Sequence, residues 1–140
     1  MNSRFHRGER LKSRKEIGRL FGKFGQSVNA YPLRLVFAEA EEVRSNFPFQ
    51  AAFVVPKRRF KKAVDRNLIK RRVREAYRIH KHVLAAPEVQ ELARTRVQGE
   101  KQEAMTQYAL MFIYTGKEAM PYKYIERKMK KILGQLVDKL

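Results

Sequence analysis

The side chains with the clearest chemistry lie between Lys57 and His82, where twelve Lys or Arg residues are opposed by two acids. This segment carries a net charge of +10 in 26 residues, more than half of the +18 of the whole chain. So much like charge repels itself and costs a folded protein stability. It is typical of a surface that binds a polyanion, because each Lys or Arg placed against a phosphate releases condensed counterions.

The spacing from Ala63 to about His82 predicts a helix that displays these charges on one side. At about 100° per residue, the basic side chains and one Asn fall within an arc of about 140°, and apolar side chains occupy a roughly opposite arc. One side is thus suited to packing and the other to phosphate. Arg72 does not fit, because it lies near the middle of the apolar arc. The polar arc contains Arg66, Asn67, Lys70, Arg71, Arg74, Arg78 and Lys81.

A charged helix face is usually just solvated, but such a face normally mixes both signs. Here Asp65 and Glu75 are the only acids in the helix. The pattern therefore favours a nucleic-acid surface, in which Arg forks suit phosphate oxygens and Asn67 suits a sugar hydroxyl or base edge. A targeting signal or a membrane-surface helix is the remaining interpretation.

The composition fits one folded domain, residues 1–140. Hydrophobic residues make up 44 % of the chain, with nine Phe and six Tyr, which argues against a disordered basic tail. No apolar run approaches the length of a membrane span, and we expect no membrane partner. The chain has no Cys, which excludes disulfides, thiolate metal sites and Cys nucleophiles and is compatible with a reducing cytoplasm.

The hydrophobic pattern predicts the element order α-β-β-α-β-α. Residues 1–12 are expected to form a flexible or loosely packed basic arm. Ser13 is the predicted N-cap of the first helix, with Glu16 completing a capping box, and this helix should run to about Phe24. The other predicted elements are strands at 31–38 and 49–55, the basic helix, a strand at 108–114 and a closing helix at 122–140.

Two further features bear on the predicted arrangement. Pro32 places its strand at a sheet edge or at a strand start. Residues 84–106 alternate acids and bases with few large apolar residues, which fits either a short solvated helix or a mobile insertion of unknown role.

No set of residues indicates a catalytic site in the protein itself. His80 and His82 are two residues apart and point to different sides of a helix, a poor spacing for metal; His80 is expected to be a packed or partly exposed ring. There is no acid cluster typical of a two-metal nuclease, no Gly-rich phosphate loop and no nucleophile elbow. We therefore predict no catalytic residue and no metal or cofactor held by the protein alone.

The segment AVDRNLIKRRVREAYR, residues 63–78, resembles the signature helix of the bacterial ribonuclease P protein component. Leu68 stands where the family's Arg-Asn-Arg triplet has its last Arg. The segments GERLKSRKEIGRLF, FVVPKRRFKKAV and YALMFIY resemble the family's opening, its strand and basic loop, and its closing half. Residues 84–106 have no obvious counterpart. The signature motif is matched by Arg66, Asn67, Ile69, Lys70, Arg71 and Arg74.

The resemblance implies an accessory subunit of an RNA-based endonuclease. In that family a catalytic RNA removes the 5′ leader of precursor tRNA, and the chemistry, with its Mg²⁺, belongs to the RNA. The implied fold is a single-domain α+β sandwich, ribosomal protein S5 domain 2-like, with one mixed sheet covered by helices. It would contain a left-handed β-α-β crossover, a hand that is rare in other proteins. The protein would be cytoplasmic, and monomeric without RNA.

The resemblance also assigns two sets of RNA contacts. The signature helix and basic loop would bind the catalytic RNA, and a cleft between the first helix and the sheet would hold the leader. Phe21 matches an aromatic of that cleft and would stack an unpaired base, although core packing is the alternative for a Phe at helical spacing. The leader set is Phe21, Ile17, Arg10, Lys12 and Arg34. The catalytic-RNA set is Arg66, Asn67, Lys70, Arg71, Arg74, Arg78, Lys57, Arg58, Arg59, Lys61 and Lys62.

Two other functions compete with this interpretation. A general RNA-binding module, such as a ribosomal protein or an RNA chaperone with no role in cleavage, would satisfy the charge pattern equally well. A DNA-binding helix in the major groove is less favoured, because no helix-turn-helix spacing or dimerisation element precedes the basic helix.

Overall fold

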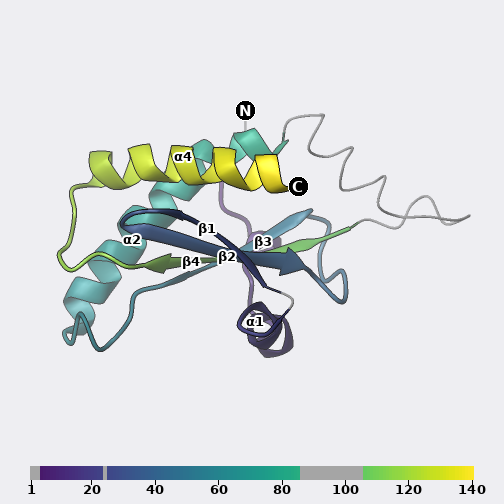
Figure 1. Ribbon diagram of the computed structural model, residues 1–140, viewed down its shortest axis with the longest axis horizontal. Coiled ribbons are helices and arrows are strands. Elements are labelled where there is room, and N and C mark those ends of the chain that lie inside the picture. The colour runs from purple at the N-terminus through teal and green to yellow at the C-terminus, as the bar shows by residue number, and fades with distance from the viewer. Residues whose placement is uncertain (1–3, 24, 86–105) are drawn as a thin grey trace, which may run out of the picture.

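The computed structural model describes residues 4–23, 25–85 and 106–140. They form one four-stranded sheet with α2 and α4 packed on one face and α1 on the other (Figure 1). The predicted α+β class with one mixed sheet is confirmed. The elements, with 3-10 helices written η, are η1 (Arg7–Glu9), α1 (Arg14–Leu20), β1 (Gln26–Ala30), β2 (Leu33–Glu39), β3 (Phe49–Val54), α2 (Ala63–His80), η2 (Lys81–Ala85), β4 (Tyr108–Tyr114) and α4 (Tyr122–Lys139).

The strands lie in the order β1-β2-β4-β3. β2 pairs antiparallel with both β1 and β4, whereas β3 pairs parallel with β4. Parallel neighbours require a long crossover connection, and α2 lies in that crossover between β3 and β4. The basic helix therefore lies in the chain between two parallel strands, and its apolar side packs in the core on the sheet. The left hand of the crossover stays a prediction from the family resemblance.

β1 is missing from the predicted order, and its composition explains why. Only Val28 and Ala30 of its five residues are buried, while the side chains between and before them are exposed. A short, mostly polar edge strand gives little hydrophobic signal, because pairing with a neighbour rather than burial defines it. β1 occupies the edge, so β2 is internal to the sheet, and Pro32 lies in the turn before β2.

The main core lies between the sheet and the helices α2 and α4. Alternate strand residues such as Leu35 and Phe112 point to this side, as the two-residue period of a strand requires. Ile69 and Val73 of α2 and Leu133 of α4 meet them. Each such fully buried side chain stabilises the fold by about 1.5–3 kcal/mol, so the apolar side of α2 fixes which side of that helix remains outside.

The opposite face of the sheet carries a smaller core. Leu20 of α1 and Leu11 pack there against a group of strand residues. The seven-residue α1 covers only part of this face: further along it, Asn29 and Arg34 are exposed and Ile113 is half-buried. The strand residues under α1 are Val36, Ala38, Ala109 and Met111.

Residues 4–12 are not the loose arm that we expected. The ring of Phe5 packs edge-on against Phe53 and Tyr77, with centroids 5.8 and 5.9 Å apart. Glu9 is buried and forms an ion pair with Lys81 at 2.7 Å. These contacts join the segment to β3 and α2, which the basic composition concealed. Residues 1–3 and most of the 84–106 segment, residues 86–105, lie outside the described part of the chain.

Candidate nucleic-acid interface

The outer face of α2 presents four exposed polar side chains: Asn67, Lys70, Arg71 and Arg74. Among the described residues, none of the four has a hydrogen bond or ion pair. The opposite side of the helix is anchored in the core, so the exposed side chains start from a rigid backbone. Three cations and an amide are thus held ready for an external partner.

Two other predicted contacts on α2 are engaged within the protein. Arg66 is half-buried, and its Nη1 donates hydrogen bonds to the carbonyl oxygens of Phe60 and Lys61 at 2.8 and 2.9 Å. Arg78 pairs with Glu75, Nε to Oε1 at 2.6 Å. The hydrogen bond from Arg78 holds the pKa of the Glu75 carboxyl below its usual value. Arg66 therefore fastens the basic loop to the helix, and Arg78 offsets the acid nearest the face.

The loop before α2 adds further positive charge beside this face. The side chain of Phe60 in this loop is buried. The backbone N–H of Phe60 donates a hydrogen bond to the Pro56 carbonyl at 3.3 Å. With Phe60 turned inward, the basic side chains on either side project into solvent. The exposed loop cations are Lys57, Arg58, Arg59, Lys61 and Lys62.

A groove runs along α2 beside the exposed cations. Arg71, Arg74 and Arg78 line it together with Phe5 and Arg10 of the N-terminal segment. The Arg10 guanidinium carbon lies 5.6 Å from the centre of the Phe5 ring. From the sequence we placed Arg10 in the leader set, but in the structure it lies beside the exposed cations of α2. Its position results from the packing of the N-terminal segment against β3 and α2.

The misfit at Arg72 is resolved by the loop that leads into α4. Arg72 Nη1 donates a hydrogen bond of 2.6 Å to the carbonyl oxygen of Met120. This arginine therefore ties α2 to the start of α4 instead of facing solvent. Leu68, at the departure from the family triplet, is half-buried and also lines the groove, so an apolar side chain replaces a cation there.

The second candidate surface lies beside α1. Phe21 follows the last residue of α1 and is 62 % exposed, so the core-packing alternative does not hold. Ile17 is half-buried against the smaller core, and Lys12 is exposed. Arg34 is exposed on the same sheet face, two residues from buried Val36 along β2. The structure thus brings an aromatic ring and two cations to the α1 side of the sheet.

Glu16 fixes α1 in this position. Its side chain is 1 % exposed, and its carboxylate accepts hydrogen bonds from Arg19, Arg44 and the backbone N–H groups of Glu41 and Glu42. Burial opposes ionisation, but the bonds from Arg44 and Arg19 and from the two amides hold the pKa of Glu16 below the ordinary glutamate value. α1 is thereby locked to the loop between β2 and β3.

The capping-box prediction for α1 is half right. Ser13 Oγ accepts a hydrogen bond from the Glu16 backbone N–H at 3.3 Å, which confirms the N-cap. The Glu16 carboxylate binds Arg19, Arg44 and the backbone N–H groups of Glu41 and Glu42 instead. It therefore does not accept a hydrogen bond from the N-cap backbone, as a capping box requires.

The remaining polar groups do not assemble a metal site in the described part of the chain. His80 is a half-buried ring whose Nε2 lies 2.9 Å from Glu126 Oε2, as expected of a packed histidine. Across residues 4–23, 25–85 and 106–140, no three His, Asp or Glu side chains lie together as metal ligands would. Within the same ranges, no helix has the length and apolar character to cross a membrane.

Comparison with known sequences agrees with the signature-helix resemblance. The sequence model of the Ribonuclease P family matches residues 5–137. A relative named ribonuclease P protein component, from Porphyromonas gingivalis strain ATCC 33277, is 35 % identical over 127 residues, which cover 91 % of this chain and 82 % of the relative. A protein of the same name from Chlorobaculum tepidum is 36 % identical over 80 residues, 56 % of this chain and 51 % of the relative.

Solved structures show the same fold. The RNase P protein of Staphylococcus aureus matches with a TM-score of 0.62 at 20 % identity, over 91 % of this chain and 94 % of that one. The RNase P protein of Thermotoga maritima matches with a TM-score of 0.58 at 20 % identity, over 94 % of this chain and 97 % of that one. At this identity the likeness concerns the arrangement of sheet and helices alone.

Proposed function

This chain belongs to the ribonuclease P protein family, and from that premise we propose how its two surfaces serve the enzyme. It is a protein subunit of ribonuclease P, and its partner is the RNA subunit. In our proposal, α2 and its basic loop bind the catalytic RNA. The α1 side of the sheet holds the 5′ leader of precursor tRNA. The family match does not support the alternative of a general RNA-binding module.

One observation carries the first assignment: Lys70, Arg71 and Arg74 are exposed on α2 with no hydrogen bond or ion pair among the described residues. A solvated face normally mixes acids with its cations. The one acid beside this face, Glu75, is four positions after Arg71, and its carboxylate is paired with Arg78, so the cations of the face remain in excess until a polyanion binds. Asn67 beside them supplies a neutral donor and acceptor, suited to a 2′-hydroxyl or a base edge.

The leader assignment depends on the exposed ring of Phe21. An unpaired leader offers bases that stack on an aromatic ring, a contact worth about 1–3 kcal/mol per base. Lys12 and Arg34 are exposed and supply charge for the leader phosphates. The hydrogen bonds and ion pairs of the Glu16 carboxylate hold α1 in place. The backbone that carries Phe21 is therefore already ordered, which lowers the entropy lost on binding.

The catalytic RNA performs the hydrolysis in this proposal. Mg²⁺ is held through the RNA phosphates, and the protein residues bind and orient the two RNAs. No step is assigned to a metal held by the protein, since the described residues offer no ligand set that fits one. The protein acts in the cytoplasm and is monomeric until it meets RNA.

The decisive experiment is cleavage of a precursor tRNA by the cognate catalytic RNA at low Mg²⁺, with and without this protein. We expect the protein to stimulate cleavage strongly, because its cations relieve phosphate repulsion that Mg²⁺ would otherwise have to screen. A variant with Lys70, Arg71 and Arg74 changed to Ala is the matched control and should stimulate only at higher protein concentration. No stimulation by the wild-type protein would refute the proposal.

A further inference from the structure

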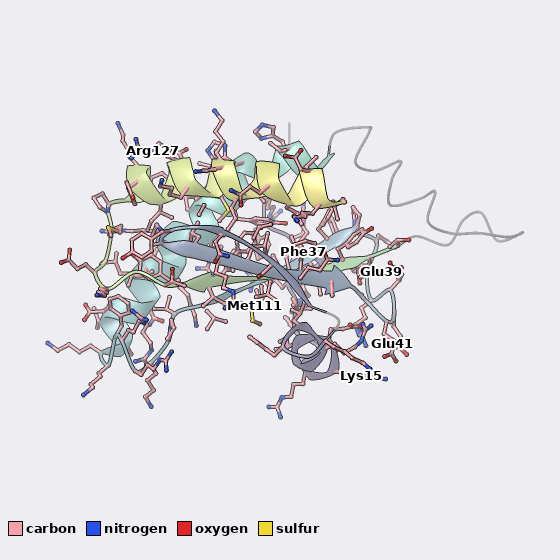
Figure 2. All side chains as sticks on the ribbon, in the orientation of Figure 1. Lys15, Phe37, Glu39, Glu41, Met111 and Arg127 are labelled. Carbon is pink, nitrogen blue, oxygen red and sulfur yellow. The ribbon has the colours of Figure 1, made fainter. Side chains whose placement is uncertain are left out.

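α4 carries a second basic face that the proposed function leaves unused. Its apolar side, including Ile125 and Met129, is fully buried in the main core. At about 100° per residue, four exposed cations fall within an arc of about 100° centred opposite that buried side. Figure 2 labels one of them, Arg127, on α4 at the margin of the molecule. We call Lys123, Arg127, Lys130 and Lys131 the α4 basic face.

The cations of this face outnumber the acids near it. α4 contains two acids: Glu126, four positions before Lys130, is engaged by His80, and Asp138 is exposed on the same side of the helix, seven positions after Lys131. No ion pair or hydrogen bond joins the side chains of the α4 basic face to another described residue. Lys123 and Arg127, and likewise Arg127 and Lys131, are separated by four positions, where like charges repel. As with α2, this arrangement calls for an external anion.

The α1 side of the molecule shows the contrast. There Lys15 pairs with Glu41 at 2.8 Å, and Arg19 and Arg44 bind Glu16. Figure 2 shows Lys15 and Glu41 together beside α1. These three basic residues are matched by acids, unlike the exposed Lys12 and Arg34 assigned to the leader and unlike the α4 basic face. The imbalance is therefore local to particular surfaces and is not only a consequence of the overall net charge.

We propose that the α4 basic face is a second contact surface for the RNA subunit, and that it binds the phosphate backbone. This inference rests on the proposed function, in which α2 already holds that RNA. α4 lies on the sheet face opposite α1 (Figure 1), away from the surface assigned to the leader, so the RNA subunit rather than precursor tRNA is the partner that fits.

The connection between the two basic faces supports the same partner. Arg72 ties α2 to the residue just before α4, and His80 of α2 binds Glu126 of α4. At this junction Glu75 is offset by Arg78. The two acids at this junction, Glu75 and Glu126, are thus both paired within the protein. An RNA that binds α2 can extend to α4 without repulsion from an unpaired acid at the junction. Two faces on adjoining helices would also fix the orientation of the protein on the RNA, which one helix alone would not.

The contact should be independent of sequence. Tyr124 is the aromatic side chain nearest the face in sequence, and its ring is covered by Arg127 and Lys128, whose charged ends lie 5.1 and 5.4 Å from its centre. A covered ring offers no free surface for base stacking. Lysine-rich, unstacked surfaces of this kind bind phosphates through charge.

The first test is a charge-matched pair of variants. One changes Lys123, Arg127 and Lys131 to Gln, which removes one cation per turn of α4. The control changes Lys15, Lys117 and Lys139 to Gln, which removes the same charge from exposed positions outside the α4 basic face. Equilibrium binding to the RNA subunit is measured between about 0.05 and 0.5 M monovalent salt, and thermal melting confirms that both variants are folded.

We expect the α4 variant to bind more weakly than the control. At about 0.15 M salt, each lost phosphate contact should cost about fourfold to fivefold in affinity and reduce the magnitude of the salt slope by about 0.7–0.9. If all three side chains contact phosphates, the three changes together should therefore weaken binding by roughly 60- to 125-fold. Equal affinity and equal slope for the α4 variant and its control would show that the α4 basic face is only solvated.

The second test maps the partner directly. The chain has no Cys, so Lys130→Cys and Arg71→Cys each provide one attachment point for a tethered iron–EDTA cleavage reagent. Within the complete ribonuclease P, the reagent at position 130 should cut the RNA subunit at nucleotides different from those cut from position 71. Two results would overturn the assignment. The reagent at position 130 could cut only precursor tRNA, or it could cut neither RNA while the reagent at position 71 cuts the RNA subunit.

The two proposals fail in distinguishable ways. If the wild-type protein does not bind the RNA subunit, the proposed function itself is refuted and the α4 assignment falls with it. If the wild-type protein binds and stimulates cleavage, while the α4 variant behaves like its control, only the α4 assignment is refuted.

Discussion

Changing Lys70, Arg71 and Arg74 together to Ala tests the proposed α2 surface most directly. These side chains are exposed and make no hydrogen bond or ion pair with other described residues. The substitution should therefore leave the fold intact. It should even favour the helix slightly, because Ala has the highest helix propensity. It also removes the repulsion of the i,i+4 pair Lys70–Arg74, which costs about 0.2–0.5 kcal/mol.

The size of the expected loss follows from counterion release. Three phosphate contacts at a slope of about 0.7–0.9 each contribute about 2–3 to the dependence of log K on log salt. At about 0.15 M salt this corresponds to roughly 50- to 150-fold in affinity for the catalytic RNA. At about 1 M salt the difference between variant and wild type should nearly vanish, because salt then competes for the same phosphates.

The assay is equilibrium binding to the catalytic RNA over a series of salt concentrations, paired with thermal melting. Arg72→Ala is the matched control on the same helix, since its side chain bonds to the Met120 carbonyl and ties α2 to α4. Loss of this half-buried, charge-assisted bond should lower the free energy of unfolding by about 1–2 kcal/mol and leave the salt slope nearly unchanged. The two variants should thus show opposite signatures.

A triple variant that keeps the wild-type slope and affinity would show that the α2 cations are merely solvated. If it instead melted markedly earlier than the wild-type protein, the three side chains would have structural contacts that contradict their exposure. Arg66 is left out of the variant because its bonds to Phe60 and Lys61 would mix loop displacement with loss of charge.

Three further predictions concern other parts of the molecule. Phe21→Ala should leave the melting temperature almost unchanged, because the ring is 62 % exposed. It should weaken binding of precursor tRNA relative to mature tRNA by up to about 1–3 kcal/mol. Equal losses for both tRNAs would contradict the leader assignment. Glu16→Gln should lower the free energy of unfolding by about 1–3 kcal/mol. The pKa of Glu16 is lowered from 4.5 in the folded state. The contribution of its carboxylate to the free energy of unfolding is therefore complete above about pH 4.5 and is lost as the pH falls through the pKa of the folded state. A stability difference between wild type and variant that does not shrink in acid would argue against this role of the Glu16 carboxylate. Asn67→Ala should reduce affinity for the catalytic RNA without changing the salt slope, because it carries no charge, and a changed slope would point to displacement of neighbouring cations.

Local patterns in the sequence predicted much of this structure. The observed bounds of α2, β4 and α4 lie close to the predicted ones. α2 and α4 each bury one face, which gives a clear helical period, and β4 is a short apolar run buried on both faces of the sheet. The exposure of Lys70, Arg71 and Arg74 followed from helix geometry once the apolar arc was assigned. Here residues near in the sequence decide the result.

The contacts that were missed depend on how the segments of the chain pack together. Glu16 was predicted to complete a capping box, yet its carboxylate binds Arg44, which is 28 positions away. The RNA contact of Arg66 stays a prediction, but the pattern did not reveal that this side chain also binds the carbonyl groups of Phe60 and Lys61, in a loop whose path is set by burial of Phe60. Such contacts exist only after the tertiary fold has formed, so helical periodicity cannot reveal them.

The packing of the N-terminal segment has a consequence for the protein before it meets its RNA. β3 is an edge strand, and an open edge is a template for pairing with another chain. Arg10 forms a parallel bridge to Ala51 near the middle of β3, and the Leu11 backbone N–H donates to the Ala51 carbonyl at 2.9 Å. The segment thus occupies hydrogen-bonding positions that a second molecule would use. At this position of the β3 edge, another strand cannot pair unless the segment is displaced first.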